Sequence, residues 1–143
     1  LAAYRSIRPE VRYGQNSRVD FLLTQDGLPD LYLEVKNAHL SRAPGLAEFP
    51  DSCTERGAKH LHELAEVARN GARAAMLFLV QRTDCDRFSL AADIDRNYAA
   101  AYEMARQAGV LGLCYDTLIS PESVKINRPL PLQGWPLDDS SPI

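Results

Sequence analysis

The sequence predicts an α/β domain in which helices flank a mixed β-sheet, and three observations support that prediction. Residues 17–37 alternate polar and apolar side chains on either side of a turn, which is typical of a β-hairpin. The apolar runs 74–81 and 110–115 have the length of buried strands. A segment with helix-capping residues precedes each run, and a strand, helix, strand order indicates a right-handed parallel crossover.

Size and composition are those of a single globular domain. The chain has 143 residues, of which 45% are hydrophobic and 24% are charged. No apolar run approaches membrane-spanning length and the first residues lack an apolar core, so we expect neither a membrane span nor a signal peptide. The first residue is Leu and the chain opens in mid-pattern, from which we expect a fragment of a longer protein.

Cysteines and charges narrow the class of protein further. Cys53, Cys85 and Cys114 are scattered without C-x-x-C spacing, which favours reduced thiols in a cytoplasmic protein over a zinc site or a disulfide framework. The net charge of −3 does not by itself indicate nucleic-acid binding. Residues 1–18, however, carry four arginines against the single acidic residue Glu10, which makes a local basic patch.

The first third of the chain is expected to be dominated by the hairpin. Residues 1–4 resemble the end of a helix, and we expect strands at 11–13, 19–24 and 31–36. The hairpin turn contains Asp26-Gly27, which is common turn chemistry. If the turn centres on Gly27, Asp20 lies directly opposite Glu34 on one face of the hairpin. The other face is then apolar, formed by Val19, Phe21, Leu23, Leu31, Leu33 and Val35.

The remaining elements follow from turn and capping signals. After the hairpin we expect a loop at 38–50, a helix that runs to about residue 70, a strand at 74–81, an irregular segment at 82–93, a helix at 96–108 and a strand at 110–115. The pattern Ser52-x-x-Glu55 is a capping box for the first helix, with Thr54 as a competing cap. Asp95 is the expected cap of the second helix.

Prolines accumulate toward the C-terminus and set the expected domain boundary. We assign residues 1–128 to the domain and residues 129–143 to a Pro-rich tail. The last dozen residues combine proline with Asp and Ser, a composition that predicts a flexible segment.

The polar face of the hairpin carries the chemistry. Two carboxylates directly opposed across a ladder repel each other, which favours either a cation between Asp20 and Glu34 or a raised pKa on one of them. Hard carboxylate oxygens suit Mg²⁺ or Mn²⁺. Lys36 shares the face of Glu34 and could orient a metal-bound water for attack on a phosphodiester. The alternative is a solvated strand face, on which Glu-x-Lys is an ion pair of little energetic value.

Four blocks of the sequence resemble the sugar fermentation stimulation protein family. They are YGQNSRVDFLL, YLEVKNAHL, FPDSCTERGAKHLHEL and IDRNYAAAYEMARQAGV, and they are spread over about residues 10–115, which is most of the chain. The resemblance implies a restriction-endonuclease-like fold with a PD-(D/E)XK nuclease core, preceded in the family by an oligonucleotide-binding-type barrel. That barrel is expected to be missing upstream of this chain. It also implies DNA binding linked to sugar metabolism.

The motif residues of the nuclease superfamily carry over onto Asp20, Glu34 and Lys36, with Val19 where the motif has proline. The expected metal ligands are Asp20, Glu34 and the main-chain carbonyl of Val35. Many superfamily members place a further carboxylate on the first helix, and Glu10 is the candidate for it here.

A basic group is expected to bind the nucleic-acid backbone. Arg56, Lys59 and His60 share one face of the first predicted helix, where cations and hydrogen-bond donors suit phosphates. Arg18 precedes the strand of Asp20 and is the fourth candidate. The alternative is a solvated helix face with neighbouring glutamates as partners. For His60 a further alternative is a boundary histidine beside the apolar stripe, and for Arg18 it is a structural ion pair.

These residues predict a DNA-binding protein of the cytoplasm that hydrolyses phosphodiesters with Mg²⁺ or Mn²⁺. The alternative is a non-catalytic DNA-binding regulator linked to sugar metabolism, which keeps the nuclease core as a scaffold. A protein-interaction module is a third reading, and it predicts no nucleic-acid affinity. Superfamily members often pair to reach both strands of DNA, so a homodimer is a further expectation.

Overall fold

A six-stranded mixed sheet forms the centre of the computed structural model, which describes residues 1–14 and 16–133. Its strand order is β1-β2-β3-β6-β8-β9. The three central strands run parallel, and the outer neighbours pair antiparallel. The strands are β1 (Ser6–Tyr13), β2 (Ser17–Thr24), β3 (Leu31–Ala38), β6 (Arg73–Val80), β8 (Leu111–Ile119) and β9 (Val124–Pro129).

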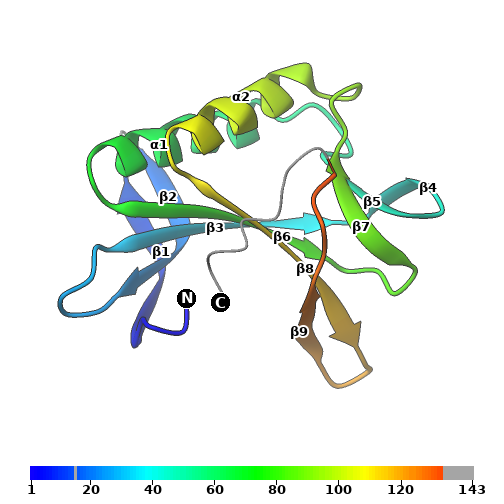
Figure 1. Ribbon diagram of the computed structural model, residues 1–143, viewed down its shortest axis with the longest axis horizontal. Coiled ribbons are helices and arrows are strands. Elements are labelled where there is room, and N and C mark those ends of the chain that lie inside the picture. The colour runs from blue at the N-terminus through cyan, green and yellow to red at the C-terminus, as the bar shows by residue number, and fades with distance from the viewer. Residues whose placement is uncertain (15, 134–143) are drawn as a thin grey trace.

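Both helices lie on the same face of this sheet (Figure 1). They are α1 (Glu55–Arg69) and α2 (Arg96–Gln107), close to the predicted ranges. Asp95 caps α2 as predicted, whereas α1 is capped by Thr54 and not by Ser52. Within the described residues, neither helix is long and apolar enough to cross a membrane.

One carboxylate joins the starts of the two helices. Asp95 accepts hydrogen bonds from the main-chain N–H of Tyr98, at 2.9 Å, and of Thr54, at 2.7 Å. Gly57 lets the first turn of α1 approach α2 closely, since a Cβ there would lie 3.0 Å from the ring of Tyr98 and 2.8 Å from Thr54 Oγ1. The position of α1 over the sheet is therefore set by α2 as well as by its own apolar stripe.

A second, three-stranded sheet occupies two segments that were predicted to be loops. Its strands are β4 (Leu40–Ala43), β5 (Gly45–Phe49) and β7 (Cys85–Leu90), in the order β4-β5-β7. The segments predicted as a loop at 38–50 and as irregular at 82–93 are therefore largely strands. Gly45 has φ +76° and forms the tight turn between β4 and β5. The sequences of these strands, LSRA, GLAEF and CDRFSL, lack the strict alternation of polar and apolar residues that indicates a strand.

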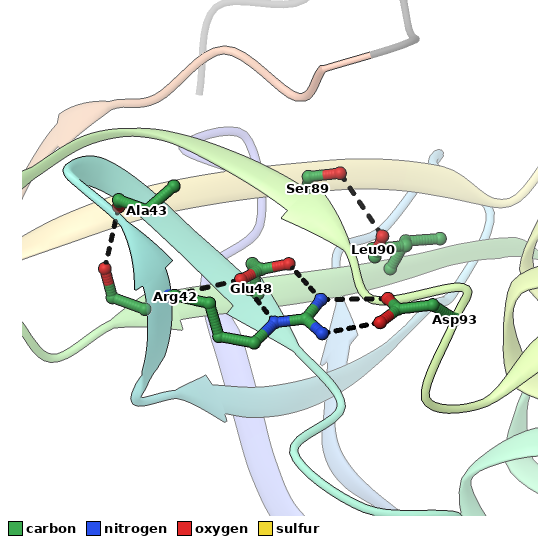
Figure 2. A network of polar contacts seen from close by, with 7 residues as sticks. Arg42, Ala43, Glu48, Ser89, Leu90 and Asp93 are labelled. Atoms are coloured by element: carbon green, nitrogen blue, oxygen red, sulfur yellow. Dashed lines mark hydrogen bonds and ion pairs between the residues drawn. The ribbon is translucent and has the colours of Figure 1, made fainter.

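Ion pairs of Arg42 fasten this second sheet to the segment before α2 (Figure 2). Its guanidinium donates to both oxygens of Glu48 on the neighbouring strand and to both oxygens of Asp93. The hydrogen bonds from Arg42 lower the pKa of Asp93 to about 2. The planar guanidinium donates to two carboxylates, which fixes the direction of these hydrogen bonds as well as their distance. The pair of strands β4 and β5 is therefore held in one orientation relative to α2.

The core has two parts, one on each face of the large sheet. The larger part packs the helices and the second sheet against β6, around Phe78, which stacks on Phe88 at 4.6 Å between ring centroids. The smaller part lies on the opposite face and contains Leu23, Leu31 and Leu33 but no helix residue. Burial of β6 on both faces agrees with its continuous apolar sequence.

Val19 and Phe21 depart from the predicted apolar face of the hairpin. Val19 is buried with Leu22 in the helix-side core, and Phe21 is about one-third exposed. Residues three apart on a regular strand face opposite sides, so the alternation is interrupted between Val19 and Leu22. That interruption falls at Asp20.

The two ends of the described chain also differ from prediction. Residues 1–4 form a turn and no helix, and the predicted short strand at 11–13 is the end of the longer strand β1. At the other end, β9 pairs with β8, and Leu130 and Leu132 are buried in the core. The folded body therefore continues past the boundary predicted at residue 128. Residues 134–143 of the predicted tail lie outside the described part.

Candidate active-site cleft

Strands β2 and β3 pair in the predicted register, but their pairing ends before Asp20 and Glu34. Leu23 pairs with Leu31 and Phe21 with Leu33, as expected for a turn centred on Gly27. The ladder stops there, so Asp20 and Glu34 are not a ladder pair. Asp20 Oδ2 instead accepts a hydrogen bond from the Val35 N–H at 2.7 Å. The predicted direct opposition is wrong because a side-chain to main-chain bond replaces the next rung.

The early end of the β2–β3 pairing also leaves the main-chain carbonyl of Val35 outside the ladder. The N–H and C=O of one strand residue point toward the same neighbouring strand. The carbonyl of Val35 therefore points toward the side on which Asp20 lies, beyond the last β2–β3 pair. An oxygen in that position lies beyond the β2–β3 pairs, on the side of the strand where Asp20 accepts from Val35.

Glu34 lies on the helix-facing side of β3 and is only 2% exposed. Its Oε1 accepts hydrogen bonds from Lys36 Nζ at 2.7 Å and from His60 Nδ1 at 2.5 Å. Its Oε2 is also buried but has no hydrogen-bond partner among the described residues. A buried carboxylate oxygen without a partner is costly, so Oε2 is the oxygen of Glu34 whose capacity to accept a donor or a cation is unused among the described residues.

The two carboxylates have opposite electrostatic surroundings. Burial raises the pKa of Asp20 above its ordinary value of 3.8; the Val35 N–H opposes this, and the charge of Glu34 adds to it. Burial also raises the pKa of Glu34, but hydrogen bonds from His60 and Lys36 outweigh it and hold that pKa below its ordinary 4.5. Glu34 is thus held as an anion, and Asp20 is the group that a nearby cation would help to ionise.

A cleft of about 730 Å³ contains every residue that the sequence analysis assigned to metal or nucleic-acid binding. Strands β1, β2 and β3 and the first turns of α1 supply its walls. The predicted residues that line it are Glu10, Arg18, Asp20, Glu34, Val35, Lys36, Arg56, Lys59 and His60. Asn16 and Ser17 line it as well and were missed, although their position at the start of the strand that carries Asp20 was a signal that could have found them.

The basic residues of the cleft differ in how they are paired. Arg56 has no ion-pair partner in the part of the chain that the structure describes, and its side chain is exposed. Lys59 Nζ lies 3.9 Å from a carboxylate oxygen of Glu63, and Arg18 lies 3.6 Å from Glu10. Arg18 and Glu10 are both exposed, so their ion pair is weak. Lys59 is exposed, but the Glu63 side chain is only 14% exposed. At 3.9 Å the Lys59–Glu63 pair is longer than a hydrogen bond, so the ammonium group of Lys59 can also reach a polyanion in the cleft.

His60 and Glu10 lie differently from the other predicted cleft residues. The side chain of His60 is 8% exposed and contacts Glu34, which agrees with the alternative of a boundary histidine beside the apolar stripe. Glu10 was the candidate for a helix carboxylate, but it lies on β1, is exposed and pairs with Arg18. Helical spacing alone could place His60 beside Arg56 and Lys59, but it could not show which of them turns toward the sheet.

The donor atoms fit a small hard cation. Asp20, Glu34 and the Val35 carbonyl offer oxygen atoms only, which suit Mg²⁺, Mn²⁺ or Ca²⁺. No group of three or more His, Cys, Asp or Glu side chains that could hold a metal occurs in residues 1–14 and 16–133. A cation here would thus keep several waters, as Mg²⁺ commonly does. The partnerless Oε2 of Glu34 is the structural observation in favour of this fit.

The sequence matches one protein-family model and many curated relatives. A family model described as the sugar fermentation stimulation protein RE domain matches residues 1–123. The chain is 59% identical over 133 residues to the sugar fermentation stimulation protein homolog of Roseobacter denitrificans, covering 93% of this chain and 57% of the relative. It is 66% identical over 126 residues to the homolog of Ruegeria pomeroyi, covering 88% and 55%. The chain thus spans about half the length of the curated relatives that it matches.

A solved structure shares the fold. It is described as the structure of Pyrococcus furiosus SfsA in complex with Ca²⁺. The match has a TM-score of 0.82 and 27% sequence identity, and it covers 92% of this chain and 56% of that chain. SfsA has a nuclease-like fold, so the predicted restriction-endonuclease-like fold class is confirmed.

Proposed function

This chain belongs to the sugar fermentation stimulation protein family, and from that membership we propose that it binds DNA and hydrolyses phosphodiester bonds with Mg²⁺ or Mn²⁺. The observation that carries the proposal is the cleft in which Asp20, Glu34 and Lys36 meet under a rim of basic side chains. The solved complex of Pyrococcus furiosus SfsA with Ca²⁺ supports it, because Ca²⁺ and Mg²⁺ both select oxygen ligands.

The two carboxylates, the main-chain carbonyl of Val35 and Lys36 each have a role in this proposal. Asp20, Glu34 and the carbonyl of Val35 would hold the cation, which when bound supplies a more acidic water and offsets charge on the phosphate. Lys36, whose side chain is 20% exposed, lies at the boundary between buried Glu34 and the open cleft. Its ammonium group can donate to an attacking water or to a phosphoryl oxygen, and so orient the reaction.

The rim of the cleft would hold the nucleic acid. Arg56 and Lys59 on α1, with Arg18 on β2, place cations around the carboxylates. Backbone contacts of this kind give affinity without sequence preference and make binding dependent on salt. The free thiols of Cys53, Cys85 and Cys114 suit the cytoplasm, which we propose as the compartment.

Cleavage of single- and double-stranded DNA and RNA, with Mg²⁺ or Mn²⁺, tests the proposal. We expect metal-dependent cleavage that Glu34→Ala and Lys36→Ala each abolish. Glu103→Ala on α2 and Lys125→Ala on β9 are matched controls that remove the same charges outside the cleft, and they should retain the activity. Cleavage that survives both cleft variants would refute the site assignment. Salt-sensitive DNA binding without turnover under either metal would support the non-catalytic regulator instead.

A further inference from the structure

Glu34 receives two hydrogen bonds on the same oxygen, and they come from groups of very different mobility. Lys36 reaches Oε1 from the same strand with a flexible four-carbon side chain, which is one-fifth exposed. His60 reaches Oε1 from α1 with a ring that is almost fully buried. We propose that His60 is a positioning residue, which holds Oε1 of Glu34 so that Oε2 faces the cation. This inference rests on the metal site of the proposed function.

The direction of the hydrogen bond follows from the chemistry of the pair. An ionised carboxylate only accepts hydrogen bonds, so Nδ1 of His60 is the donor. With both donors on Oε1, the carboxylate of Glu34 cannot turn without breaking a short, charge-assisted bond. Oε2, which has no partner among the described residues, is thereby the oxygen presented to a ligand.

His60 becomes the decisive contact once Lys36 acts on substrate. In the proposed reaction Lys36 donates to a water or a phosphoryl oxygen, and its ammonium group then turns away from Glu34. His60 is the only other described residue that donates to Oε1. It thus keeps the carboxylate in place while Lys36 changes partner, a common task of groups that contact metal ligands.

The helix that carries His60 is itself firmly placed. Thr54 caps α1 through the Gly57 N–H at 3.0 Å, and Asp95 holds the Thr54 N–H. The close approach of Gly57 to Tyr98 leaves little freedom for the first turn of α1. His60 lies in the next turn, so its ring has a fixed base from which to orient Glu34.

Two amide variants test this role at nearly constant polarity. His60→Asn places an amide donor where Nδ1 lies, whereas His60→Gln places it nearer the position of Nε2. We would measure Mn²⁺ binding to the 143-residue chain by isothermal titration calorimetry and folding by thermal unfolding. His60→Gln should weaken Mn²⁺ binding by about 10- to 100-fold, and His60→Asn should stay close to the parent. His60→Leu, which removes the donor, should match His60→Gln if it folds.

The outcomes separate this role from the proposed reaction. Equal Mn²⁺ affinity for the parent, His60→Asn and His60→Gln would overturn the positioning role, even if the parent cleaves nucleic acid. Equal loss in both amide variants would also overturn it, since the donor position would then be irrelevant. Loss confined to His60→Gln supports the role, even if no variant cleaves and the proposed hydrolysis fails. A parent that does not bind Mn²⁺ refutes both.

Discussion

Replacing Asp95 by Ala should destabilise the protein more than its place at a helix end suggests. This carboxylate serves two helices, because it caps α2 through the Tyr98 N–H and also holds the N–H of Thr54, the cap of α1. Asp95 is itself buried. Water therefore has little access to replace either hydrogen bond after the substitution.

The magnitude follows from the two bonds. Loss of an N-terminal cap costs about 1 kcal/mol. The N–H of Thr54, left without its charged partner in a part-buried position, costs roughly 1–3 kcal/mol more. The expected loss of unfolding free energy is therefore about 2–4 kcal/mol. For 143 residues the entropy of unfolding is about 0.3 kcal/mol per kelvin, which converts this loss to a fall in Tm of roughly 7–13 °C.

Urea titration and thermal unfolding of Asp95→Ala, with two comparison variants, would measure this loss. Asp95→Asn keeps one acceptor oxygen and should fall between the parent and Asp95→Ala. Asp86→Ala removes an exposed aspartate on β7 whose hydrogen-bond partner is the adjacent Arg87, and should change stability by less than about 0.5 kcal/mol. The hydrogen bonds hold the pKa of Asp95 below 3.8, so its contribution is present above that pH and is lost as pH falls through the lower folded-state pKa. A loss for Asp95→Ala no larger than that for Asp86→Ala would refute the reasoning.

Two further predictions concern the cleft. Asp20→Asn should raise the Tm of the metal-free protein at neutral pH, because the pKa of Asp20 is raised in the folded state and its charge opposes folding. The difference in Tm between the parent and Asp20→Asn should shrink as pH falls through the raised pKa, and it should vanish below about 3.8. Asp20→Asn should fail to bind Mn²⁺ at every pH. A parent that is more stable than Asp20→Asn at pH 7 would contradict this prediction. Replacing Arg56 and Lys59 together by Ala should weaken DNA binding and reduce the slope of log K against log salt by about 1.4–1.8, for two lost phosphate contacts. An unchanged slope in fluorescence-anisotropy titrations would show that these side chains do not contact the backbone.

Local chemistry explains which parts of the fold could be predicted from sequence. Asp95 was identified as a cap because capping depends on residues within one turn of the helix. The pairing of Phe21 with Leu33 followed from the turn at Gly27, since turn geometry sets the register of a hairpin. Asp20, Glu34 and Lys36 were predicted from alternation along two adjacent strands together with the family resemblance, and the structure brings all three to one cleft.

Long-range contacts explain the rest. The bond from the Val35 N–H to Asp20 joins residues 15 positions apart and ends a ladder that the residue pattern would continue. The strand β7 is stabilised by parallel pairing with β5, some 40 residues earlier in the chain, which no local pattern shows. The contact of His60 with Glu34 depends on how α1 is rotated over the sheet, and that rotation is set by packing against α2.

The early end of the β2–β3 ladder has an evolutionary consequence. A Thr or Val at position 20 could not reach the Val35 N–H, and we expect the two strands then to close by one more rung, as neighbouring β-branched residues favour. One substitution would thus turn an open hairpin, with its proposed cation site, into a continuous and more stable one. If the cleft functions as proposed, we expect a gene copy released from selection on it to drift toward that closed form, and relatives that use the cleft to keep the aspartate.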